Sequence, residues 1–220
     1  MTSGTTFFFD NLWSGLVVWA VLYVSDYSFT LACARLYRQG VYDKIVFEGS
    51  FELNPYFQAD IDALRVVSPR FIAALIIGLA YLAAIRWLAA ESALGLYEFV
   101  LGAVISSELA IHVRHLRNFL LFRAIVRGED IQGRIHYSRP IILRMSSVEL
   151  LGFSVLFGVI SIFTSSWFLI GGTAACVALA LKHWRQANKQ AGNGQNEVFQ
   201  TRHEPALPAQ IEPTSTAKYR

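Results

Sequence analysis

Between Val148 and Leu181 the chain runs for 34 residues with a single formal charge, Glu149. As one α-helix this segment would be about 51 Å long, well beyond the roughly 30 Å thickness of a bilayer's hydrocarbon core. Three small polar residues, Thr164 to Ser166, interrupt it near its middle. The segment therefore predicts two short membrane spans, 148–163 and 166–182, joined by a turn. Ser146, with Glu149 three residues later, has the pattern of a capping box and predicts the start of the first span.

Three further apolar segments are long enough to cross a membrane: 12–34, 70–88 and 93–113. The composition agrees, because 54% of the residues are hydrophobic and only 16% are charged, against about 25% charged in soluble proteins. The sequence predicts an all-α, polytopic helical membrane protein with about five transmembrane helices. The transmembrane domain is predicted over 1–185.

The segments between the spans carry their own signals. Asn54-Pro55 has the pattern of a helix start, and the apolar residues Phe57, Ile61, Leu64 and Val67 follow on one side. This pattern predicts a short amphipathic helix at the membrane interface. Ser68-Pro69 repeats the start signal before the second span. The third helix is expected to continue to about Val126. The segment 186–220 is rich in Gln, Asn, Pro and Thr, and predicts a disordered tail.

The distribution of Lys and Arg predicts the orientation. With five spans, the 35–69 loop, the 112–146 loop and the tail share one side. Nearly all Lys and Arg residues lie on that side, with Arg86 as the main exception. The positive-inside rule then makes that side, with its tail, cytoplasmic and leaves the N-terminus outside. We expect a multi-pass protein of the cell inner (plasma) membrane. The basic 112–146 loop could bind anionic lipid head groups.

Ionisable residues inside the predicted spans need an explanation. Asp26 and Glu108 lie about 14 and 15 residues into their spans, roughly 21 to 23 Å from the outer surface, and Glu149 lies near the same level. A charged residue at such depth costs about 2.5 to 3.5 kcal/mol on insertion scales, so it should face other helices. One interpretation is a polar pocket open to the cytoplasm. Its predicted lining is Asp26, Thr30, Glu108, His112 and Glu149.

The alternative interpretation is structural. Polar residues in membranes also join helices, and the acids could pair with Arg35, Arg114 or His112 for that purpose alone.

A third interpretation concerns the spacing of Glu108, His112 and His115. Intervals of four and three residues place one carboxylate and two imidazoles on one helix face, the residue types of a 2-His-1-carboxylate metal site. The neighbouring Arg114 and Arg117 oppose a cation. Ligands on one helix also usually need help from a second helix.

Two short motifs carry a resemblance. The first span contains Asp26-x-x-x-Thr30, and Glu52-Leu53-Asn54-Pro55 comes shortly before the second. Over about residues 20–90 the chain resembles a family of small prokaryotic membrane proteins of unknown function with a D-x-x-x-T first span and an E-x-N-P element. The resemblance implies a multi-span helical protein and supplies no activity. It marks Glu52, Asn54 and Pro55 as a cytoplasmic motif. It also suggests that Asp26, Thr30, Glu52 and Asn54 meet at the cytoplasmic end of the first two spans.

Three classes of function remain open. The first is a binding or scaffold component of a membrane assembly, with a membrane protein or a second copy as partner besides the lipid bilayer. The second is a small-solute or proton-coupled transporter, and the third is an intramembrane metal- or lipid-dependent enzyme. We lean against an enzyme, and no cofactor is identified. The sequence has no phosphate-binding Gly loop, no Ser-His-Asp set and no nucleic-acid module.

Overall fold

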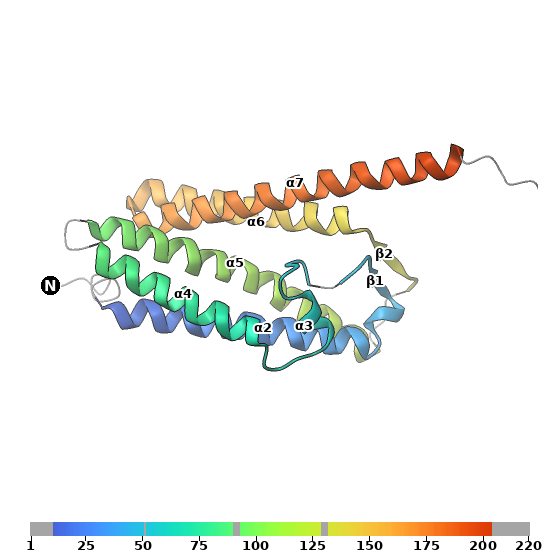
Figure 1. The fold of residues 1–220 in the computed structure, drawn as a ribbon, viewed down its shortest axis with the longest axis horizontal. Coiled ribbons are helices and arrows are strands. Elements are labelled where there is room, and N and C mark those ends of the chain that lie inside the picture. The colour runs from blue at the N-terminus through green and yellow to red at the C-terminus, as the bar shows by residue number, and fades with distance from the viewer. Residues whose placement is uncertain (1–10, 51, 90–92, 129–131, 204–220) are drawn as a thin grey trace, which may run out of the picture.

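The computed structural model describes residues 11–50, 52–89, 93–128 and 132–203. The described residues form five helices that are long and apolar enough to cross a membrane, so the predicted all-α, five-span architecture is confirmed. These helices run side by side and alternate in direction (Figure 1). The connecting residues 39–50, 52–68 and 132–138 and the end of the last helix lie at the same end of the bundle. The helices are α2 (Leu12–Arg38), α4 (Pro69–Leu88), α5 (Leu94–Val126), α6 (Arg139–Thr164) and α7 (Trp167–His203).

Two sequence signals mark helix boundaries as predicted. Ser68 caps α4 by accepting a hydrogen bond from Phe71 N–H, and Pro69 follows it in the first turn. The long apolar segment divides between Thr164 and Trp167, where Ser165 adopts a left-handed conformation with φ 50°. That residue ends α6 and lets the chain reverse into α7.

The predicted start of α6 is wrong. The helix begins at Arg139, because Pro140 in the first turn favours a helix start there and the apolar residues after it continue the helix. Ser146 and Ser147 are therefore interior helical residues and both are buried. Ser147 Oγ donates to the carbonyl oxygen of Ala180 on α7, so its hydroxyl joins two helices instead of capping one.

The predicted amphipathic helix is shorter than expected. Only α3 (Gln58–Asp62) is helical, because Asn54 Oδ1 accepts from Tyr56 N–H in a turn and Leu64 has a positive φ of 52°. Ile61 is buried against α2, where it belongs to a cluster with Tyr27 and Leu31. The segment thus packs on the bundle.

The predicted disordered tail differs from the structure in its first part. Helix α7 continues through residues 186–203. Extending a formed helix costs less than nucleating one, so polar residues that follow a span can remain helical. Residues 204–220 of the predicted tail lie outside the described residues.

A small parallel sheet, which the sequence analysis did not predict, joins the two long connections. Strand β1 (Ile45–Phe47), after the 3-10 helix η1 (Val41–Asp43), pairs with β2 (Ile135–Tyr137), with Ile45 opposite Ile135. The sheet fixes the loop after α2 to the loop before α6.

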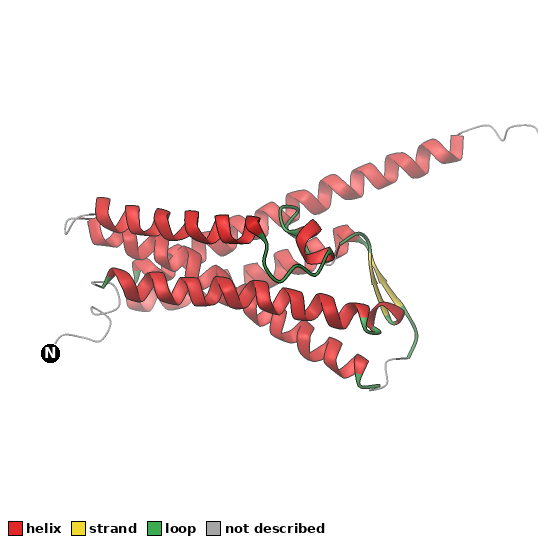
Figure 2. Cartoon of the chain, turned by 60° about the horizontal axis from the view of Figure 1, so that its bottom comes forward, coloured by secondary structure: helices red, strands yellow, loops and turns green. Residues whose placement is uncertain are grey.

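The helices are tightly packed at one end and separated at the other. Helix α7 packs on both α5 and α6. Its contact with α5 depends on Gly102 and Gly171, because a methyl group at either position would overlap a backbone carbonyl of the other helix. Toward the sheet the helices fan apart, with α3 and its flanking loops between them (Figure 2).

Candidate functional site

A cavity of about 500 Å³ lies where the helices separate. Its walls come from all five long helices and from the connection that contains β1 and α3. Most of the residues singled out in the sequence line it, including both short motifs: Asp26, Thr30, Glu52, Asn54, Pro55, Glu108 and Glu149. His115 also lines the cavity, whereas His112 lies outside its lining.

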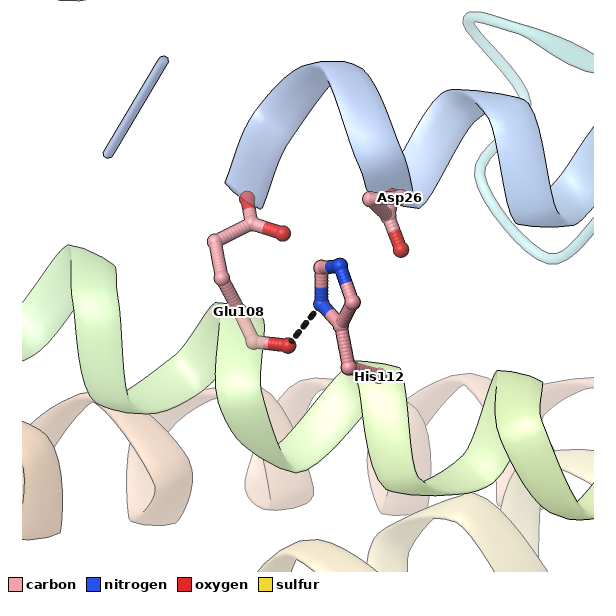
Figure 3. Close-up of side chains that lie close together, drawn as sticks. All are labelled: Asp26, Glu108 and His112. Carbon is pink, nitrogen blue, oxygen red and sulfur yellow. Dashed lines mark hydrogen bonds between the residues drawn. The ribbon is translucent and has the colours of Figure 1, made fainter. Parts of the chain in front are cut away.

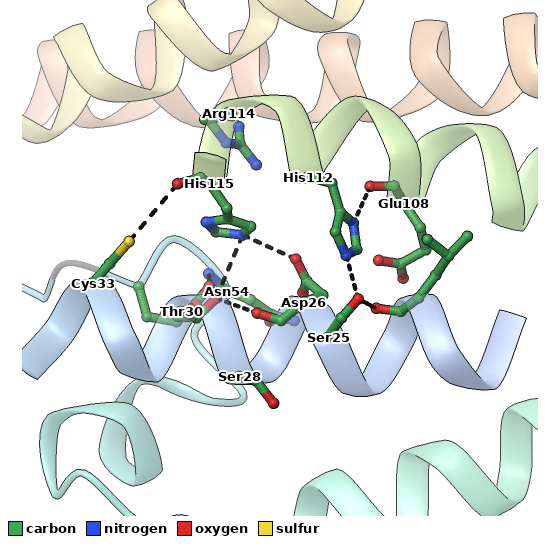
Figure 4. Close-up of polar contacts among 12 residues, drawn as sticks. Ser25, Asp26, Ser28, Thr30, Cys33, Asn54, Glu108, His112, Arg114 and His115 are labelled. Atoms are coloured by element: carbon green, nitrogen blue, oxygen red, sulfur yellow. Dashed lines mark hydrogen bonds and ion pairs between the residues drawn. The ribbon is translucent and has the colours of Figure 1, made fainter. Parts of the chain in front are cut away.

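His115 joins α5 to the first motif on α2. Its Nε2 lies 3.0 Å from Asp26 Oδ1 and 3.4 Å from Thr30 Oγ1 (Figure 4). Thr30 Oγ1 also donates to the Asp26 carbonyl oxygen at 3.0 Å. His115 is buried, but the Asp26 side chain keeps 26% of its surface exposed. Since Asp26 lines the cavity, its carboxyl group is reachable from there.

His112 points toward the same part of α2, one turn away from His115. Its Nδ1 lies 2.7 Å from the carbonyl oxygen of Glu108, and its Nε2 lies 2.6 Å from Ser25 Oγ (Figure 4). The Glu108 carboxylate differs, since its Oε2 is buried and has no hydrogen-bond partner among the described residues. A buried carboxylate oxygen without a partner is costly and therefore needs an explanation.

The group of possible metal ligands is not the one that the spacing predicted. Asp26, Glu108 and His112 each place one ligand atom within 4.8 Å of the others (Figure 3). His115, which the sequence grouped with Glu108 and His112, is not in this group; it contacts Asp26 instead. The second helix that such a site needs is α2, which sequence spacing within α5 alone cannot reveal.

Two arginines of α5 turn toward α6. Arg117 forms an ion pair with Glu149, and Arg114 donates to Ser146 Oγ, which in turn lies 2.9 Å from His183 Nδ1 on α7. Glu149 thus joins two helices, as the structural interpretation of the acids predicted. Its partner is Arg117 and not Arg35 or Arg114. The Arg117 side chain is 54% exposed, so the pair contributes at most about 1 kcal/mol.

The second motif lies over the cavity as a turn. Glu52 Oε1 accepts from Asn54 N–H at 2.6 Å. Glu52 is half-buried, and this burial raises the pKa of its carboxyl group despite the opposing effect of that hydrogen bond. The turn is held from α6, because the Arg139 guanidinium donates to the carbonyl oxygens of Ser50, Glu52 and Leu53 at 2.7 to 3.1 Å.

Sequence reasoning missed two basic residues of the site. Lys182 and His183 on α7 line the cavity together with Arg114 and Arg117 on α5, which the sequence had already placed near the acids. Lys182 and His183 follow an apolar stretch, where a basic residue usually marks the membrane interface. Their role in the lining depends on how α7 diverges from α5. Arg139, which belongs to the predicted lipid-binding loop, contacts the protein's own backbone.

The chain has no match among protein-family models, curated proteins or solved structures. Its likeness to the family of small prokaryotic membrane proteins rests on the two motifs alone.

Proposed function

We propose that this protein is a membrane-embedded binding component that takes a small, charged ligand into the cavity at the loop end of the bundle. The supporting observation is the cavity itself, with Asp26 and Glu108 in its lining. Its volume of about 500 Å³ falls within the roughly 300 to 1,000 Å³ that is typical of small-molecule sites. Ionisable groups within membrane spans that face a cavity commonly mark a ligand path.

The pattern of partners favours binding over a scaffold role alone. If the acids only joined helices, each would have a basic partner, as Glu149 has in Arg117. Asp26 has such a contact with His115, but Glu108 has a buried oxygen without a hydrogen-bond partner among the described residues, and both acids line the cavity. The lining also carries positive groups on α5 and α7, among them Arg114 and Lys182. A ligand with charges of both signs suits such a surface.

We place the loop end of the bundle in the cytoplasm of a cell whose inner membrane holds the protein. The bias of Lys and Arg toward that end supports this orientation. A reporter that works only in the cytoplasm should then be active when it is fused after Arg220. A reporter that works only outside the cytoplasm should be inactive there. Basic residues at the same end that extend outward, Arg123 and Arg127, remain candidates for contact with anionic lipid head groups.

Transport is the second candidate function. The cavity lining begins at Glu108 on α5 and Leu179 on α7, beyond Gly102 and Gly171, where the backbones of these two helices are in contact. A site reachable from one side and closed on the other is what an alternating-access carrier presents in one of its states. This candidate additionally requires an opening between α5 and α7.

Cysteine labelling tests the binding proposal. In a background with Cys33 and Cys176 replaced by Ala, we expect Asp26→Cys and Glu108→Cys to react with a membrane-impermeant thiol reagent in inverted vesicles. Val24→Cys is the matched control, because it lies two residues from Asp26 on α2 and does not line this cavity. It should stay unlabelled in the lipid. Inert cysteines at both 26 and 108 would refute the cavity proposal, and Asn118→Cys, also in the lining, checks that the bundle is intact.

A further inference from the structure

Three side chains from two helices meet beside the cavity with the chemistry of a metal site. Asp26 comes from α2, and Glu108 and His112 lie one turn apart on α5 (Figure 3). Their ligand atoms all lie within 4.8 Å of one another. Oxygen and nitrogen ligands at about 2.0 to 2.2 Å from one ion lie no more than about 4.4 Å apart. Small side-chain rotations therefore suffice to bring all three onto one ion.

The hydrogen bonds of His112 present a suitable ring nitrogen. Nδ1 lies 2.7 Å from the Glu108 carbonyl oxygen, which can only accept, so Nδ1 carries the proton. In the neutral ring Nε2 is then the nitrogen with a free lone pair. Metal-binding histidines are typically oriented by such a bond from their other nitrogen to a backbone carbonyl. Nε2 lies 2.6 Å from Ser25 Oγ, and this hydroxyl has a second acceptor 2.9 Å away, the Leu22 carbonyl oxygen. Ser25 can therefore release Nε2 without losing all its hydrogen bonds.

Two carboxylate oxygens in this group lack hydrogen bonds. Glu108 Oε2 and Asp26 Oδ1 are buried, and within the described part of the chain neither has a hydrogen-bond partner. Asp26 Oδ1 lies 3.0 Å from His115 Nε2, an ion-pair distance without the direction of a hydrogen bond. Buried carboxylate oxygens without hydrogen bonds are unfavourable, and a cation bound by both carboxylates would stabilise them.

The nearby basic residues do not fill that role for both acids. Among the described residues His115 forms an ion pair with Asp26 but not with Glu108. Arg114 donates to Ser146 and Arg117 pairs with Glu149, so both are engaged toward α6. These contacts with α6 reduce the repulsion that the two guanidinium groups would exert on a cation bound by Asp26, Glu108 and His112.

We propose that Asp26, Glu108 and His112 bind one divalent first-row transition-metal ion. Two carboxylate oxygens and one imidazole nitrogen are ligands that suit Mn²⁺, Fe²⁺, Co²⁺ or Zn²⁺. Ca²⁺ and Mg²⁺ prefer sites made of oxygen ligands alone, and Cu⁺ prefers thiolates. Three protein ligands leave coordination positions open. Since Asp26 and Glu108 line the cavity, the open positions face the space through which an ion or its ligand enters. This assignment deepens the proposed function and rests on it only for the route of entry.

Co²⁺ is the probe, because its visible absorption reports ligation by nitrogen and oxygen. The full chain, purified in detergent and freed of metal with a chelator, should bind one Co²⁺ per chain, and Zn²⁺ should displace it. Asp26→Asn, Glu108→Gln and His112→Gln should each weaken binding by more than about 100-fold, the most that loss of an outer-shell group costs. His183→Gln and Glu149→Gln are the matched controls, because they alter the same residue types in the cavity lining outside the group.

Two results would overturn the proposal. One is the absence of saturable one-to-one Co²⁺ binding, and the other is an equal change of Co²⁺ affinity in the three ligand variants and the two controls. Since a ligand variant could fail to fold, Ser25→Ala provides an independent readout. It removes the hydrogen bond that Nε2 must give up, so binding should tighten roughly two- to tenfold. An unchanged or weaker affinity would contradict Nε2 as the ligand. The cysteine labelling at positions 26 and 108 needs no ion, so the cavity proposal can survive a failure of the metal proposal.

Discussion

The two halves of helix α5 have opposite surroundings. In the half that begins at Leu94, Leu101 and Ile105 are buried in an apolar cluster, and Gly102 lets the α7 backbone approach closely. In the half that ends at Val126, the neighbouring helices diverge and Glu108 faces a cavity. We call these the closed half and the open half.

The difference follows from side-chain size and charge. Small and apolar residues allow helix backbones to meet, and no water or ligand is needed between them. Ionisable residues inside a membrane need partners or a hydrated space, and in the open half Asp26 and Glu108 line a cavity. One helix thus joins a closely packed half to a half that faces a cavity.

The largest expected effect concerns the closed half. Gly171→Ala would place a methyl group on the Phe99 carbonyl oxygen of α5, and a backbone atom cannot rotate away. We expect a loss of about 3 kcal/mol, the upper range for overpacking, or about 6 to 12 °C in melting temperature for a chain of this size. Thermal unfolding of the purified protein in detergent measures it.

The matched control is Gly152→Ala on α6, where an added methyl group meets nothing within 4 Å. Its melting temperature should stay the same or rise, because Ala is favoured over Gly within helices by about 1 kcal/mol. Equal losses at the two positions would show that the closed half does not depend on backbone contact.

The second expected effect concerns the cover of the open half. Arg139→Gln removes three charge-assisted hydrogen bonds to the turn that carries Glu52. If about 1.5 to 3 kcal/mol of local stability is lost, amide exchange in residues 52–57 should accelerate by at least about tenfold. Hydrogen-exchange mass spectrometry measures this rate.

Arg134→Gln is the control for this change. Arg134 is exposed and lies in the connection between α5 and α6. Its guanidinium lies 5.5 Å from the centre of the Tyr42 ring, and it forms no hydrogen bond to the turn among the described residues. Exchange in residues 52–57 should match that of the unmodified protein. If Arg139→Gln also leaves the exchange rate unchanged, Arg139 does not hold the turn.

Features that depend on local sequence are predicted more directly than features that depend on contacts between distant segments. Apolar length predicts the five spans, and Ser68-Pro69 marks the start of α4 because capping is a local property. The start of α6 is also local, but two signals competed there and Pro140 prevailed over Ser146. Parallel pairing of β1 with β2 depends on two segments that are distant in the chain, so no local pattern indicates it.

The candidate site shows the same division. Depth in the membrane indicates that Asp26 and Glu108 need partners. It does not indicate that His115 would contact Asp26 while His112 joins the two acids. That choice depends on how α2 and α5 are rotated about their axes. Side chains from α6 and α7 enter the cavity through the divergence of those helices, which no residue pattern specifies.

The smallest expected effect concerns the pH dependence of the open half. Burial raises the pKa of Glu52 above its usual value of 4.5, so the folded protein holds this proton more tightly than the unfolded chain. Its contribution to stability is fully present below pH 4.5 and is lost as the pH rises through the raised pKa. Glu52→Gln cannot ionise and removes this loss. Melting temperatures of the two proteins between pH 4 and 8 should therefore diverge as the pH rises, with the variant the more stable. The difference between the two curves cancels the titration of all other groups. Parallel curves would mean that Glu52 is solvated like a surface acid, and that the turn does not enclose the open half.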